Sequence, residues 1–109
     1  MAEREHCQVL TTIDSAEAAE ALARGVVTAR LAACAQVGGP IASTYWWDGV
    51  IDSAKEWQIV FKTTIERYGQ LEAYLRTHHP YQVPEILCLP VLAGSSEYLE
   101  WISAQTADG

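Results

Sequence analysis

The sequence predicts an α+β fold in which one antiparallel sheet carries helices on one face. Segments with an apolar period of two alternate with segments whose apolar residues recur every three or four positions. The two longest strand-like segments are joined by Asp48-Gly49, a strong hairpin signal. A chain of 109 residues, 50% hydrophobic and 19% charged, has the size and composition of one packed domain over residues 1–109.

The first strand and helix follow the N-terminal residues. Residues 7–13 are β-prone, and Asp14 with Glu17 has the spacing of a helix N-cap and a supporting acid. Over residues 15 to about 30, apolar positions follow the spacing of one buried helical face: Ala19, Leu22, Ala23, Val26 and Val27. These small side chains predict a helix that packs closely on the sheet.

Two long strands come next, over residues 31–47 and 50–63. Gly38-Gly39-Pro40 interrupts the first strand and predicts a bend or bulge there. The second strand alternates cleanly, with one face formed by Trp57, Ile59, Phe61 and Thr63.

A second helix, a short strand and a last helix complete the order. Thr63 with Glu66 offers a capping box, and the helix ends where His79 meets Pro80. Its apolar stripe consists of Tyr68, Leu71, Leu75 and His78. Residues 84–91 read as a short strand, and Pro90 marks its far end as either a sheet edge or a strand exit.

Gly94-Ser95 opens the short C-terminal helix, and residues 103–109 are expected to fray. The order is therefore βαββαβ with an added helix, which is the ferredoxin-like arrangement.

Composition excludes several functional classes. A net charge of −7 without a basic patch argues against a nucleic-acid partner. No apolar stretch is long enough to span a bilayer, and the N-terminus lacks the features of a signal peptide, so we expect no membrane partner and a cytoplasmic location. The cysteines number 3, with no CxxC pair, which fits reduced thiols. The common catalytic motifs are missing, so we do not expect an enzyme.

Aromatic residues predict an oligomer. Tyr45, Trp46 and Trp47 are consecutive, so both faces of one strand carry large aromatic side chains. Helices on one face of the sheet would leave some of them in water, where another subunit can cover them. The alternative is an exposed aromatic edge without a partner.

Five blocks in order along the chain carry a family resemblance: RLAAC at 30–34, STYWWDG at 43–49, KTT at 62–64, HHPYQVPEI at 78–86 and YLEW at 98–101. They resemble the signature blocks of the CutA family, the divalent-ion tolerance proteins. The resemblance implies a ferredoxin-like homotrimer whose long strands pair across subunit edges, with a link to copper or other divalent cations. It also implies architectural kinship with the PII signalling proteins, whose trimers bind small effectors at subunit clefts. The alternative function is therefore a trimeric sensor or scaffold that binds a small effector or a protein.

The candidate metal ligands are His78, His79 and Glu85. Imidazole suits Cu²⁺, Zn²⁺ and Ni²⁺, but adjacent helical residues point about 100° apart. Both histidines can therefore bind one ion only if the helix unwinds before Pro80; otherwise one of them is structural, and His78 could instead continue the buried stripe. Glu85 stands at the entrance to an apolar strand, where a carboxylate needs a partner.

A salt bridge of Glu85 with Lys62 or Arg30 is the alternative to metal binding. Tyr81 and Trp101, like the aromatic run at 45–47, are expected to pack or to line a cleft.

The resemblance also implies a cysteine ligand near the end of the first strand, at the position of Thr11. Threonine there removes the thiolate, the softest ligand of that set. Cys7 shares a face with Thr11 but lies some 13 Å away, at about 3.3 Å per residue, so it is a poor substitute. We expect Cys34 and Cys88 to be small core residues, and His6 to lie in a fraying terminus without a role.

Overall fold

The structure, a computed structural model, describes residues 5–107. The expectations about the leading residues 1–4 and about residues 108–109 lie outside this part of the chain. Its elements are, in order, β1 (His6–Ile13), α1 (Ala16–Thr28), β2 (Cys34–Trp47), β3 (Val50–Thr64), α2 (Ile65–His78), β4 (Leu87–Pro90) and α3 (Ser96–Gln105). This order confirms the predicted βαββαβ arrangement with a C-terminal helix.

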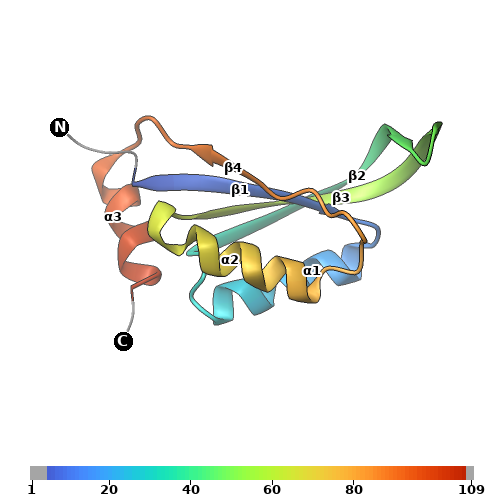
Figure 1. The fold of residues 1–109 in the computed structure, drawn as a ribbon. Coiled ribbons are helices and arrows are strands. Elements are labelled where there is room, and N and C mark those ends of the chain that lie inside the picture. The colour runs from blue at the N-terminus through green and yellow to red at the C-terminus, as the bar shows by residue number, and fades with distance from the viewer. Residues whose placement is uncertain (1–4, 108–109) are drawn as a thin grey trace.

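The sheet has four strands in the order β2-β3-β1-β4, and every neighbouring pair is antiparallel. Helices α1 and α2 lie on the same face of it, while α3 lies at one end (Figure 1). The core between sheet and helices contains fully buried Val9 and Phe61 from the strands and Leu71 and Leu75 from α2. Strand β4 is an edge strand, which is one of the two readings of Pro90.

The N-caps of α1 and α2 each differ by one residue from the prediction. The α1 cap is Ser15, whose hydroxyl accepts a hydrogen bond from the backbone N–H of Ala18 at 3.0 Å. The α2 cap is Thr64 rather than Thr63. Thr63 faces the core, where it is fully buried and its hydroxyl donates to the backbone oxygen of Leu31 at 2.7 Å. Strand alternation therefore decides which of two adjacent threonines can cap the helix.

Strands β2 and β3 form a long hairpin. Their register shifts between Gly38 and Ile41, which confirms the predicted bulge. At the turn, Asp48 and Gly49 both have positive φ, of 52° and 81°, as a two-residue turn of the primed type requires. The far part of the hairpin extends beyond the helices, and the described chain measures 46 × 27 × 22 Å (Figure 1).

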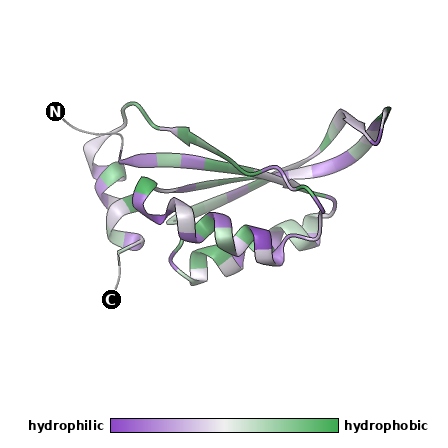
Figure 2. Cartoon of the chain, viewed as in Figure 1, coloured by the Kyte–Doolittle hydropathy of each residue, from purple (hydrophilic) through white to green (hydrophobic). Residues whose placement is uncertain are grey.

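The end of this hairpin is apolar and uncovered within the single chain. The exposed fractions are 71% for Trp46, 61% for Val50 and 62% for Ile51. Figure 2 shows a hydrophobic stretch at the far end of the hairpin and another along β4 and the segment after it. Isolated exposed apolar residues are ordinary, but a contiguous set on one projecting element indicates a surface for association.

Two expectations about the termini are wrong. Residues 103–107 do not fray, because α3 continues to Gln105 and packs on the body: Ile102 and Thr106 are each only 2% exposed. His6 begins β1, is 8% exposed, and shares a 2.9 Å hydrogen bond between its Nε2 atom and the Ser103 hydroxyl. The N-terminal strand and the C-terminal helix hold each other in place. Within residues 5–107, none of the helices has both the length and the apolarity that a membrane crossing needs.

Candidate cation site at the end of helix α2

Helix α2 ends between two adjacent histidines because Pro80 disfavours helical backbone in the residue before it. His79 is extended, with φ −82° and ψ 134°, while its N–H still bonds the Leu75 oxygen at 2.8 Å. This change of backbone direction separates the two side chains: His78 is exposed and His79 is 7% exposed. The expectation that His78 continues the buried stripe is therefore wrong, since the stripe stops at Leu75.

Both ring nitrogens of His79 are occupied by the backbone. Nε2 lies 2.7 Å from the carbonyl oxygen of Thr12, and the N–H of Tyr81 lies 3.1 Å from Nδ1. Because a carbonyl only accepts and an amide N–H only donates, His79 carries its proton on Nε2 and offers its Nδ1 lone pair to Tyr81. A metal ion could bind this ring only by breaking one of these hydrogen bonds.

His78 is arranged in the opposite way. Its Nδ1 donates to the Tyr74 carbonyl oxygen at 2.9 Å, and its ring stacks on the Tyr74 ring with centroids 4.0 Å apart. The proton on Nδ1 leaves the Nε2 lone pair without a hydrogen-bond partner in the structure, on an exposed side chain. A histidine whose other nitrogen is fixed by a backbone carbonyl is the usual form of a metal-binding imidazole.

Glu85 belongs to a groove beside this helix end, not to a preformed metal cluster. The groove has a volume of about 750 Å³, and its charged lining consists of Asp52, Glu56 and Glu85. In the described part of the chain, no group of three His, Cys, Asp or Glu side chains comes together to hold an ion. The alternative salt-bridge partners of Glu85 are engaged elsewhere, Lys62 with Gln36 at 2.6 Å and Arg30 with the Gln105 carbonyl at 2.8 Å.

Glu56 is a buried carboxylate that the sequence reasoning missed. It is 7% exposed and accepts a hydrogen bond from the Tyr81 hydroxyl at 2.8 Å. Burial first, and then this hydrogen bond and the charge of Glu56, raise the pKa of Tyr81 above its ordinary value. With the two bonds of His79, this contact fixes the loop after α2 against β1 and β3. No local signal marks Glu56, since its partner lies 25 positions away.

Thr11, at the position of the implied cysteine ligand, lies in the core. It is fully buried, and its hydroxyl has no hydrogen-bond partner within residues 5–107. It pairs with Ile59 of β3 and shares the helix-facing side of β1 with Val9. The side chain of Thr12, which lines the groove, points to the other face.

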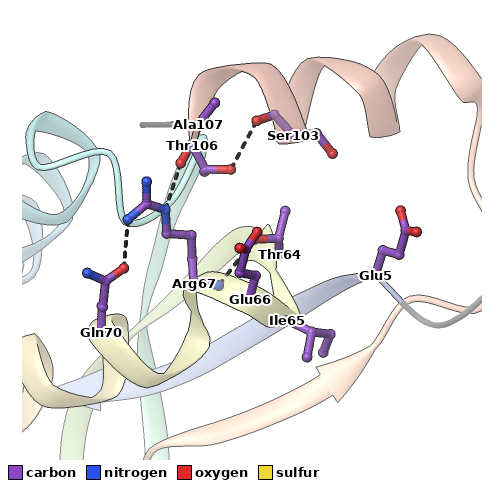
Figure 3. A pocket seen from close by; sticks show the side chains of 9 residues that line it. All are labelled: Glu5, Thr64, Ile65, Glu66, Arg67, Gln70, Ser103, Thr106 and Ala107. Atoms are coloured by element: carbon purple, nitrogen blue, oxygen red, sulfur yellow. Dashed lines mark hydrogen bonds between the residues drawn. The ribbon is translucent and has the colours of Figure 1, made fainter. Parts of the chain in front are cut away.

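Another cavity, of about 770 Å³, lies between the start of α2 and the end of α3 (Figure 3). Arg67 crosses it, with Nε donating to the Thr106 carbonyl at 2.7 Å and Nη1 to the Gln70 side chain at 2.6 Å. The first hydrogen bond holds the end of α3 to α2, and the second lies within α2. We therefore assign this cavity a structural role.

Comparison with known proteins gives a consistent result. Residues 7–105 match the family described as CutA1 divalent ion tolerance protein. The divalent-cation tolerance protein CutA of Escherichia coli strain K12 / DH10B is 41% identical over 96 residues, which covers 88% of this chain and 86% of the relative.

Solved structures agree over nearly the whole chain. CutA from Synechococcus elongatus PCC7942 has a TM-score of 0.92 at 36% identity, covering 98% of this chain and 95% of its own. CutA1 from Oryza sativa has a TM-score of 0.92 at 31% identity, covering 96% of each chain.

Proposed function

Because the chain belongs to the CutA1 divalent ion tolerance family, we propose that it acts as a homotrimer that binds divalent cations, copper among them, in the response to metal ions. The observation that carries the metal part is the hydrogen-bonding state of His78: its Nδ1 is held by a backbone carbonyl, while Nε2 has no hydrogen-bond partner among the described residues, on an exposed side chain. The protein acts in this proposal by binding and not by catalysis, in the cytoplasm, where its three free cysteines stay reduced.

In this proposal the candidate ligands have different roles. His78 binds the cation directly, and Glu85 supplies a carboxylate from the segment 81–85 that lines the groove. His79 is a positioning residue, since its hydrogen bonds to Thr12 and Tyr81 fix the point where α2 stops. With one imidazole and no three-donor cluster in the described residues, binding by a single chain is weak, which suits transient exchange of Cu²⁺ or Zn²⁺.

The homotrimer rests on the projecting β2–β3 hairpin. Its apolar end, with Trp46, Val50 and Ile51 all more than 60% exposed, is the kind of surface that a second copy covers. A long edge strand such as β2 also offers unpaired backbone groups for pairing across subunits.

Isothermal titration with Cu²⁺ and Zn²⁺ tests the metal proposal. We expect saturable binding that His78→Ala weakens about tenfold or more, and that Glu85→Gln weakens less. His79→Ala should instead lower the unfolding temperature, because it leaves the Thr12 carbonyl and the Tyr81 N–H without their partner.

The control is His6→Ala, which removes an imidazole bonded to Ser103 at the other end of β1. No saturable binding, or binding that survives His78→Ala unchanged, would overturn the role of His78.

The groove supports a second candidate function, a sensor or scaffold that binds a small effector. Its lining combines the carboxylates Asp52, Glu56 and Glu85 with the aromatic rings of Tyr45, Trp47 and Tyr81, and contains no Lys, Arg or His. Such a surface favours a cationic or neutral ligand over a phosphate. Thermal-shift screening of organic cations and nucleotides tests it. We expect amines to raise the unfolding temperature of the wild type but not of Asp52→Asn; no shift by any amine would exclude this function.

A further inference from the structure

Two of the free cysteines are neighbours across the edge of the sheet. In the β1–β4 pairing, Cys7 stands opposite Pro90 and Cys88 stands opposite Val9. Residues opposite each other share a face of the sheet, so both thiols lie on the helix-facing side, as diagonal neighbours on adjacent strands. Cys7 is fully buried and Cys88 is partly buried against the same core.

The two thiols interact with each other. Burial, then a side-chain hydrogen bond with Cys88 and the charge interaction with it, raise the pKa of the Cys7 thiol to about 12. Tyr68 of α2 packs against the same core as the two cysteines, so α2 covers this part of the sheet. Both cysteines are free, and no disulfide joins them.

We propose that Cys7 and Cys88 form a two-coordinate site for a thiophilic monovalent cation of the Cu(I) or Ag(I) type. Two thiolates on rigid neighbouring strands can bind such an ion from opposite sides, and soft sulfur ligands select soft ions of this kind. On binding, both S–H bonds break, the protons pass to solvent, and two S–metal bonds form without any transfer of electrons. This site is separate from the end of α2 and does not depend on His78.

The surroundings favour a two-coordinate ion over Zn²⁺. Structural zinc takes four ligands in a tetrahedron, and no third His, Cys, Asp or Glu joins the pair within residues 5–107. The apolar neighbours Val9 and Phe61 offer no oxygen ligand for a hard cation. An ion balanced by two thiolates leaves a net charge of −1, beside the partly exposed edge strand β4.

Access to the site comes from the edge. β4 is the outermost strand and has only four residues, Leu87–Pro90. Cys88 is partly exposed there, so it meets the ion first, and exchange of the proton on Cys7 completes the site. Because the cation must displace a proton from each thiol, binding weakens as the pH falls.

The test is an anaerobic competition titration of the full chain with Cu(I), held by the chromophoric chelator bicinchoninate, and a parallel titration with Ag(I). We expect one ion per chain, a thiolate-to-metal absorption band, and affinity that rises with pH. Cys7→Val and Cys88→Val should each lower the affinity by roughly 100-fold or more, since even an outer-shell partner of a metal ligand is worth 10–100-fold.

The matched control is Cys34→Ala, which removes the remaining thiol at the start of β2 and should leave the affinity unchanged. If Cys7→Val fails to fold, the Cys88→Val variant decides, because its side chain is only partly buried. Affinity that survives Cys88→Val, or that Cys34→Ala removes, would overturn the site. If His78→Ala abolishes divalent-cation binding but leaves the Cu(I) affinity unchanged, the two sites are separate. Loss of Cu(I) affinity in Cys88→Val with unchanged divalent-cation binding shows the same separation.

Discussion

At the scale of single residues, one buried side-chain oxygen lacks a hydrogen-bond partner among the residues described. The Thr11 hydroxyl is fully buried and makes no hydrogen bond. A buried hydroxyl without a partner costs about 1–3 kcal/mol relative to water. We therefore predict that Thr11→Val, which keeps the shape and removes the hydroxyl, raises the free energy of unfolding by about 1 kcal/mol, measured by urea denaturation.

Thr63→Val is the matched control for this prediction. Thr63 is also fully buried on the helix-facing side, but its hydroxyl donates to the Leu31 carbonyl at 2.7 Å. Valine there leaves that carbonyl unpaired, so we expect a loss of about 1–3 kcal/mol. Destabilisation of the same size in both variants would show that the Thr11 hydroxyl does have a partner.

The raised pKa of Tyr81 predicts that the stability of the fold falls at alkaline pH. Its pKa is raised above 10.0 by burial and by the hydrogen bond to Glu56, so the folded protein holds this proton more tightly than the unfolded chain. The resulting stability is complete below about pH 10 and is lost as the pH rises through the folded-state pKa. Urea denaturation between pH 8 and pH 11 should therefore show a shallower alkaline decline for Tyr81→Phe than for the wild type. Identical slopes would contradict this role.

At the scale of elements, the bulge in β2 depends on one of two adjacent glycines. Gly39 has φ 152°, and a Cβ there would lie 2.7 Å from a ring carbon of Trp57 and 3.0 Å from the Glu56 carbonyl oxygen. At Gly38 a Cβ would meet nothing within 4 Å. We predict that Gly39→Ala lowers the free energy of unfolding by about 1–3 kcal/mol, while Gly38→Ala changes it by less than about 1 kcal/mol.

Chemical denaturation of the two variants checks this prediction. Because Glu56 stands beside the bulge, Gly39→Ala should also disturb its hydrogen bond to Tyr81. A loss of less than about 1 kcal/mol for Gly39→Ala would mean that the bulge tolerates a side chain, contrary to the packing of Trp57.

At the scale of the whole molecule, the projecting hairpin predicts self-association. Burying its apolar end contributes roughly 25 cal/mol per Å². We predict that the double change Trp46→Ser, Ile51→Ser shifts the protein from trimer toward monomer at micromolar concentration, measured by light scattering after size-exclusion chromatography. Ala73→Ser, on the exposed side of α2, is the control and should leave the mass unchanged. A wild type that is monomeric at every concentration would refute the trimer.

The sequence by itself determined the order of the elements. The alternation in β3, the helical stripe of α1 and the Asp48-Gly49 turn are local patterns, and the structure confirms each of them. It also identified the family, through blocks spread over the chain that residues 7–105 match as a whole. The apolar period of a helix or strand can be read from a single sequence, because each element must bury one face.

Only the tertiary structure decided which of several adjacent candidates has a ring nitrogen free of a hydrogen bond to the described residues. His78 and His79 look equivalent in the sequence. In the structure, however, the carbonyl of Thr12, 67 positions away, accepts a hydrogen bond from His79. Glu56 with Tyr81, and Cys7 with Cys88, are likewise pairs formed between distant segments. A hydrogen bond depends on the direction of one lone pair toward one partner, and sequence spacing does not encode that direction for residues on different elements.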